Sequence, residues 1–257
     1  DLNIAGMTMS VYNLISQYIL IIGSIVALVF LAVAGNEKRA AAGLTRQNWK
    51  SAVFIVLLFV GIYIVRTVVS MAGQGVSDGS GMQYVKEWAA MFKNPMMWLN
   101  IAALPINYFF VFIAFFGEEY GWRYYLQPVL QKRFGLRAGV IILGVVWGLW
   151  HIPDDLFYYT QTSGIQMIFA QQITCISLGI FFAYAYMKTQ NIWVPVCLHY
   201  LNNNLIPIIS GTFSADVLEN QTVSWKDLPV ALVLNGLCFG FFLLADVFKK
   251  KEVQEEE

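Results

Sequence analysis

Three short groups of polar residues interrupt the apolar part of this sequence, and their side chains are of types that perform hydrolysis. The first group, residues 117–123, places two adjacent carboxylates and an arginine directly after the apolar run 108–116. The other two groups hold the two histidines of the chain, His151 and His199. An ionisable group in hydrocarbon costs about 2.5–3.5 kcal/mol even on lenient insertion scales, so such groups are functional candidates by default. We therefore expect one buried polar site.

The spacing within these groups gives each side chain a direction. Glu119 and Arg123 are four positions apart, so on a helix they share a face and can form an ion pair. Glu118 is turned by about 100° from Glu119 and escapes that pair. His199 and Asn203 are also four positions apart and project together. The sequence thus predicts one carboxylate that an arginine holds and one that is free for chemistry.

Glycines leave space beside these polar groups. Gly121 has no side chain to cover Glu118, which leaves room for water or for a substrate backbone. Gly144 and Gly148 form a small-xxx-small pair in the segment that leads to His151. Such pairs let a membrane helix approach a neighbour closely. We expect the His151 helix to have one close partner.

These residue types suit the hydrolysis of an amide bond. A carboxylate beside a histidine can activate water as a general base, and an asparagine with a second histidine can donate hydrogen bonds to the developing oxyanion. The sequence contains neither the HExxH motif of helical zinc proteases nor the GxSxG motif of serine hydrolases. Glutamates and histidines also bind metals, so a divalent ion such as zinc, held by Glu118, His151 and His199, is the alternative.

The composition places this site in a membrane. The 257 residues are 58% hydrophobic and 12% charged, with a mean hydropathy of +0.59, whereas a soluble domain has about 25% charged residues. The net charge of zero gives no case for nucleic acid binding. The three cysteines lie in apolar segments with neither metal-ligand nor disulfide spacing. We predict an all-α polytopic bundle that forms a single domain over residues 1–257, with the lipid bilayer around it.

A membrane span needs about 20 apolar residues. Seven segments qualify, and an eighth span arises if the long stretch 98–130 is a hairpin. Pro105 marks the start of that stretch or a kink in it, and residues 84–92 with Trp88 predict a short interfacial helix. The seven predicted spans are 11–34, 51–72, 98–130, 138–156, 166–187, 192–210 and 230–248.

The charged loops predict an orientation because consecutive spans alternate between the two sides. With the loop 36–50 in the cytoplasm, the cytoplasmic loops and tail hold eleven lysines and arginines and the outer loops hold three. This bias predicts a multi-pass protein of the cell membrane with the N-terminus outside and the C-terminus in the cytoplasm. The first residue is Asp1 rather than methionine, which we interpret as a processed end, and we expect no signal peptide.

The predicted spans place the polar groups at similar depth. At 1.5 Å per helical residue, Glu118 lies roughly 19 Å from the cytoplasmic edge and His151 roughly 21 Å. By the same rise, His199 and Asn203 lie at roughly 13 and 19 Å. Three helices therefore bring their polar groups to a common level, which a shared buried site explains.

At these residues the sequence resembles the CPBP family, the CAAX-protease and bacteriocin-processing intramembrane proteases. The family has three motifs, EExxxR, FxxxH and Hxxx(N/D), and their order and spacing match here over residues 118–203, about a third of the chain. Trp147 stands where the family usually has phenylalanine, which keeps an aromatic wall. The resemblance implies an intramembrane endopeptidase with a motif-bearing catalytic core at 105–210 and a site open to the cytoplasm.

The resemblance also implies a role for each site residue. Glu118 is then the general base, His151 helps it to activate water, and the ion pair of the first motif supports it. His199 and Asn203 then line the oxyanion site. We expect a glutamate protease without metal, acting on a membrane-associated peptide or protein. A peptide pheromone, a bacteriocin leader or a membrane protein is favoured over a prenylated C-terminus.

Two other functions stay open. A non-catalytic immunity or scaffold protein would keep the fold and tolerate Glu118→Gln. A transporter would use the polar cluster as a proton or ion site, although the cluster lies wholly in the second half and no inverted repeat relates the halves. We expect residues 1–97 to be scaffold and substrate access, and Asp154 and Asp155 to lie in a solvated loop. Structural roles are expected for Arg66, Gln171, Gln172, Asn202 and Asn204.

Overall fold

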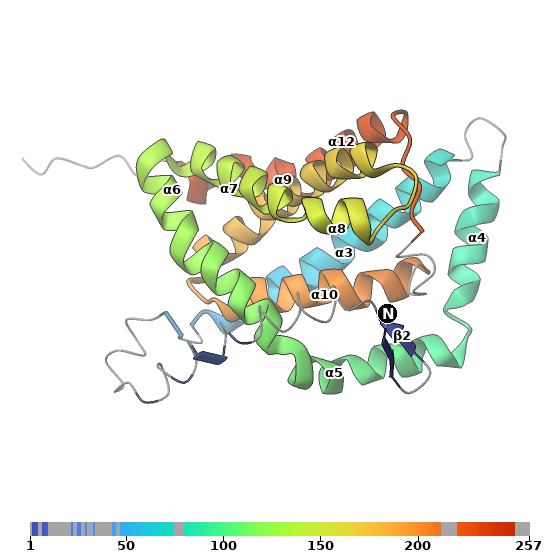
Figure 1. Cartoon of the computed structure of the whole chain (residues 1–257), viewed down its shortest axis with the longest axis horizontal. Helices are drawn as coiled ribbons and strands as arrows, with labels where there is room; N and C mark the ends of the chain where they lie inside the picture. Colours follow the sequence, from blue (N-terminus) through green and yellow to red (C-terminus); the bar gives the residue numbers. More distant parts are fainter. Residues whose placement is uncertain are drawn as a thin grey trace, which may run out of the picture.

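The computed structural model describes residues 47–74, 80–211 and 220–249, and within the first 46 residues it describes 2–4, 7–9 and seven single positions. These parts form a helical bundle, which confirms the all-α prediction (Figure 1). Two three-residue strands, β1 (Leu2–Ile4) and β2 (Met7–Met9), pair antiparallel near the N-terminus. The predicted first span, 11–34, lies outside the described residues apart from a few positions.

The described part of the chain is almost entirely helical. In chain order the helices are α3 (Trp49–Gln74), α4 (Gly81–Met91), α5 (Pro95–Glu119), the π-helix η1 (Tyr120–Leu126), α6 (Gln127–Phe134), α7 (Leu136–Trp150), α8 (Ile152–Phe157), α9 (Gly164–Thr189), α10 (Trp193–Ser210), α12 (Asp227–Cys238) and the 3₁₀ segments η2 (Gly240–Leu244) and η3 (Asp246–Phe248).

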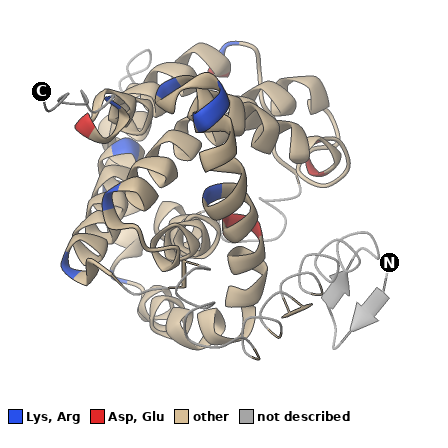
Figure 2. Cartoon of the chain, turned by 90° about the vertical axis from the view of Figure 1, so that its left-hand side faces the viewer, with Lys and Arg blue, Asp and Glu red and all other residues tan. Residues whose placement is uncertain are grey.

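Four helical runs are long and apolar enough to cross a membrane, and they coincide with the second to fifth predicted spans. They are Trp49–Gly73, Pro95–Phe134, Leu136–Phe157 and Gly164–Thr189. They support a multi-pass membrane protein. The run Pro95–Phe134 is continuous from α5 through η1 to α6, so it is not a hairpin and adds no eighth span. Charged residues occupy few positions along the helices (Figure 2).

The last two predicted spans are less regular. The sixth is α10, which has 18 residues. The seventh begins as the short apolar helix α12 and continues as η2 and η3 rather than as one α-helix. The short helix expected at 84–92 is present as α4, and its Trp88 indole donates to the Ile209 carbonyl at 2.6 Å. The end of α10 is therefore tied to α4.

Local sequence signals explain where the site-bearing helices begin and end. The Asn94 side chain accepts a hydrogen bond from the Met96 amide at 3.0 Å with Pro95 at the first position, so α5 has a standard N-cap. Gly135 separates α6 from α7 with φ of +89°, a conformation that glycine adopts without strain. Gln190 ends α9 in the left-handed region with φ of +51°. These turns place the three motifs on separate helices.

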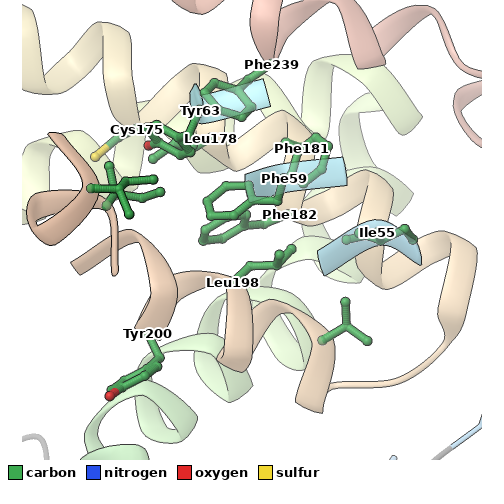
Figure 3. Close-up of a cluster of buried hydrophobic side chains, with 14 of the residues drawn as sticks. Ile55, Phe59, Tyr63, Cys175, Leu178, Phe181, Phe182, Leu198, Tyr200 and Phe239 are labelled. Carbon is green, nitrogen blue, oxygen red and sulfur yellow. The ribbon is translucent and has the colours of Figure 1, made fainter. Parts of the chain in front are cut away.

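The bundle is organised around α9, which contacts α3, α7, α8, α10 and α12. Its Phe181 and Phe182 lie against Phe59 of α3, with ring centroids 5.6 and 6.0 Å apart, and Phe239 lies 5.8 Å from Phe59 (Figure 3). Aromatic pairs of this kind add about 0.5–1.5 kcal/mol each beyond burial. This cluster fixes α3 and the end of α12 against α9.

The glycines of α7 let it pack closely on α9, as predicted. A Cβ atom on Gly144 would lie 2.6 Å from the Ile176 Cα atom, and one on Gly148 would lie 2.6 Å from the Gln172 amide nitrogen. Gln172 Nε2 donates to the Gly144 carbonyl at 3.3 Å, which agrees with the structural role expected for that residue. The close partner of the His151 helix is therefore α9.

The expectation that residues 154–155 lie in a solvated loop is wrong, because both residues are helical and Asp155 is buried. They lie in α8, where Asp155 is fully buried, and neither carboxylate oxygen has a hydrogen-bond partner among the described residues. Pro153 and two acidic residues favour the first turn of a helix, so the chain continues as α8 and packs on α9. Burial raises the pKa of the neighbouring Tyr159 hydroxyl, and the Asp154 and Asp155 carboxylates raise it further.

Candidate functional site

Glu119 is the centre of the polar site and joins the first motif to the third. Its Oε2 accepts a hydrogen bond from Arg123 Nε at 2.8 Å, and its Oε1 bonds His199 Nδ1 at 2.9 Å. Glu119 and Arg123 are fully buried, and His199 is 4% exposed. The predicted pair of Glu119 and Arg123 is confirmed. The bond to His199 spans 80 positions of the chain and could not be read from local spacing.

The helix changes form where the arginine lies. Residues Tyr120–Leu126 make a π-helix, which spacing alone did not predict, although single π turns are frequent at functional sites. Arg123 Nη1 also donates to the Gly179 carbonyl at 3.4 Å. The guanidinium lies 5.2 Å from the Trp147 ring centre and 5.5 Å from that of Phe182. The buried cation thus has a carboxylate, a carbonyl and two aromatic faces around it.

Trp147 forms the aromatic wall expected from the second motif. It is 3% exposed, and its ring centroid lies 5.4 Å from that of His199 and 5.8 Å from that of His151. It therefore contacts both histidine rings as well as Arg123. The larger indole in place of phenylalanine fills the space between these groups.

Glu118 is directed away from the ion pair, as its helical position predicts. Its Oε2 is buried and has no hydrogen-bond partner in the described part of the chain. It lies close enough to His199 and Asp154 to interact with both electrostatically. A Cβ atom on Gly121 would meet nothing within 4 Å, so the space there is open. A buried polar atom without a protein partner is usually bonded to water or a ligand, so this oxygen can accept a hydrogen bond from a molecule that enters the site.

The hydrogen bonds of the two histidines define their tautomers. His151 caps the C-terminus of α7, and its Nδ1 lies 2.9 Å from the Trp147 carbonyl, with Cys175 Sγ at 3.8 Å. Because a carbonyl only accepts, Nδ1 carries the hydrogen and Nε2 of the neutral ring is an acceptor. His199 Nδ1 likewise donates to Glu119, and its Nε2 becomes a donor when the ring is an imidazolium.

Asn203 follows His199 by one turn of α10 and is exposed. Its Oδ1 accepts a hydrogen bond from Asn202 Nδ2 at 2.9 Å. Asn202 in turn links α10 to α3 through the Tyr63 hydroxyl, which agrees with the structural role expected for it. Asn204 Nδ2 instead donates to the Tyr200 carbonyl within α10, so it does not join two helices. The Asn203 amide is thus bonded to a neighbour on its own helix, one turn beyond the buried ring of His199.

Several residues of the site were not identified from the sequence. Gly179, Phe182 and Cys175 of α9 contact Arg123 or His151, but α9 carries no ionisable motif that would have indicated this. Asp155 had a signal, because an acidic pair directly follows the second motif in an apolar segment. The local pattern predicted a loop because it did not show α9 covering that segment.

The available donor side chains bear on the metal alternative. Across residues 47–74, 80–211 and 220–249, no three or more His, Cys, Asp or Glu side chains gather in a group that could hold a metal ion. The three residues of that alternative, Glu118, His151 and His199, therefore do not form such a group. We therefore assign no step of the chemistry to a metal, and a chelator experiment tests the alternative directly.

Comparisons with known proteins agree with the motifs. Residues 99–205 match the family model described as Type II CAAX prenyl endopeptidase Rce1-like. CAAX prenyl protease 2 of Methanococcus maripaludis is 27% identical over 125 residues, which are 45% of this chain and 45% of that protein, so the chain matches less than half of the relative's length. No solved structure matches the chain. The resemblance to the CPBP family is confirmed, and the segment of this chain that carries all three motifs is Rce1-like.

Proposed function

We propose that this protein is an intramembrane endopeptidase that hydrolyses a peptide bond of a membrane-associated peptide or protein. The observation that carries the proposal is the contrast between two adjacent carboxylates. Glu119 is fully buried and bonded to Arg123 and His199, whereas a buried oxygen of Glu118 has no partner among the described residues. Glu119, whose carboxylate is held by two partners, is then the supporting group. Glu118, which has an oxygen without a partner, is the general base.

The reaction that fits this site starts at Glu118. Its carboxylate takes a proton from water, and His151 Nε2 accepts the second hydrogen bond that orients that water. The water oxygen attacks the substrate carbonyl carbon, and the carbonyl oxygen becomes the oxyanion. Glu118 then gives its proton to the leaving amine as the carbon–nitrogen bond breaks. Atoms and protons balance, and Glu118 is regenerated.

His199 and Asn203 are the proposed donors to the oxyanion. The negative charge of Glu119 stabilises an imidazolium at His199, whose Nε2 then donates. Arg123 keeps Glu119 ionised in a buried place, so the ion pair acts through His199 rather than on the substrate. Removal of one oxyanion donor lowers kcat by about 10²–10³ in comparable sites. The buried ion pair and the aromatic wall serve to hold these donors in place.

Two substrate classes are candidates. A bacterial peptide, such as a pheromone or bacteriocin leader, or a membrane protein is the first candidate. A prenylated C-terminus is the second, because the matched family and the archaeal relative are described as CAAX prenyl proteases. We place the core at residues 105–210, with the N-terminus outside, the C-terminus in the cytoplasm and the site open to the cytoplasm.

The test compares new peptide N-termini in cells that express wild type or Glu118→Gln at matched protein levels. The substitution keeps the size of the side chain and removes its basicity, so cleavages should be present with wild type alone. Those peptides also identify the substrate class, since cleavage near a prenylated C-terminus releases a short C-terminal fragment, whereas cleavage of a leader releases an N-terminal one. Identical peptide maps together with a phenotype that persists in the variant would instead support the immunity or scaffold function.

A further inference from the structure

A short chain of hydrogen bonds joins α3, which lies outside the family match, to the asparagine of the third motif. The Tyr63 hydroxyl donates to Asn202 Oδ1, and Asn202 Nδ2 donates to Asn203 Oδ1 at 2.9 Å. We propose that Tyr63 and Asn202 are positioning residues that hold the Asn203 amide with its nitrogen free to face the oxyanion. This proposal rests on the proposed function. It gives a positioning role to α3, a helix that carries none of the three motifs.

The direction of each bond fixes the orientation of both amides. The hydrogen of a buried tyrosine hydroxyl needs an acceptor, and the oxygen of Asn202 is the acceptor beside it. Asn202 Nδ2 therefore faces Asn203, and because it only donates, it must meet the oxygen of that amide. The remaining group of Asn203 is Nδ2, which has N–H donors. A flipped amide would present oxygen lone pairs to the oxyanion and repel it.

Tyr63 is a rigid anchor for the relay. It is 6% exposed, and its ring lies 4.9 Å from that of Phe59 and 5.1 Å from that of Phe239 (Figure 3). The Arg66 guanidinium lies 5.7 Å from the same ring centre. Asn203, in contrast, is exposed at the end of the relay. An exposed amide rotates freely unless a neighbour holds it, so the packed tyrosine supplies the order that Asn203 lacks by itself.

The relay predicts an effect on the rate rather than on substrate binding. Tyr63→Phe removes one oxygen atom and leaves the ring in its aromatic cluster. We expect kcat to fall about tenfold with KM unchanged, which corresponds to about 1.4 kcal/mol of transition-state stabilisation. Asn202→Ala removes the second link and should have the same effect. The matched control is Tyr200→Phe, which deletes a buried hydroxyl that donates to the Leu104 carbonyl at 2.7 Å and should change kcat less than twofold.

A double-mutant cycle separates positioning from general stability. In an Asn203→Ala background, Tyr63→Phe should have no further effect on kcat, because the group that it positions is gone. An equal loss in that background, or a loss no larger than that of Tyr200→Phe, would overturn the proposal. Failure of the proposed function can be told apart from failure of the relay. In the first case wild type and Glu118→Gln would give the same cleavage, whereas in the second they would differ. NMR of asparagine-labelled protein tests the relay without a substrate, since Tyr63→Phe must shift the side-chain amide signals of Asn202 and Asn203, and unchanged signals would refute it.

Discussion

Replacement of Arg123 by methionine tests whether the buried ion pair is held together as the structure indicates. Methionine keeps the apolar stem of the side chain but lacks the guanidinium group and its charge. The variant leaves the fully buried carboxylate of Glu119 with His199 as its remaining partner. It also removes the bond to the Gly179 carbonyl and the cation between the rings of Trp147 and Phe182.

The size of the effect follows from these lost contacts. Removal of one partner of a buried ion pair costs about 3–5 kcal/mol, because the other charge is left uncompensated. A cation against an aromatic face contributes about 0.5–2 kcal/mol more. We therefore expect Arg123→Met to lower the free energy of unfolding by about 3.5–7 kcal/mol. The double variant Glu119→Gln with Arg123→Met removes both charges, and it should be less destabilised than Arg123→Met alone, because no buried charge then lacks a partner.

The assay is unfolding of the purified protein in detergent, and the unfolded fraction is measured by a spectroscopic signal or by proteolysis. Arg137→Met is the control, because Arg137 is exposed and its Nε bonds the Leu243 carbonyl at 3.2 Å. Its loss should cost less than about 1 kcal/mol. A double variant as unstable as the sum of its two single variants would refute the reasoning, since the two charges would then not compensate each other.

Three further predictions concern the chemistry, the packing and the orientation. A chelator such as 1,10-phenanthroline should leave wild-type cleavage unchanged, whereas a loss that zinc restores would establish the metal alternative. Gly144→Ala should destabilise the protein by about 1–3 kcal/mol, because its Cβ would lie 2.6 Å from the Ile176 Cα atom; Gly236→Ala, whose Cβ meets nothing within 4 Å, is the control and should not destabilise it. Reporter fusions at residue 135 should report the cytoplasm and fusions at residue 93 the outside, and the reverse pattern would overturn the positive-inside assignment.

Relations within a single helix were determined by the sequence. The pairing of Glu119 with Arg123 and the separate direction of Glu118 follow from helical periodicity, and the structure contains both. The close approach of α7 to a neighbour followed from Gly144 and Gly148, because the absence of side chains is a local property. The all-α membrane class followed from composition, since a chain so poor in charge has little polar surface to expose to water.

Relations between helices were decided by the tertiary structure. The bond from Glu119 to His199 and the position of Trp147 against both histidines depend on how α5, α7 and α10 are rotated about their axes. The burial of Asp155 depends on α9 covering α8. Rotation and crossing of helices are set jointly by all the side chains at their contacts, so no single segment contains this information. The sequence therefore determined the candidate groups and their relations within one helix, whereas only the folded bundle decided which groups of different helices contact one another.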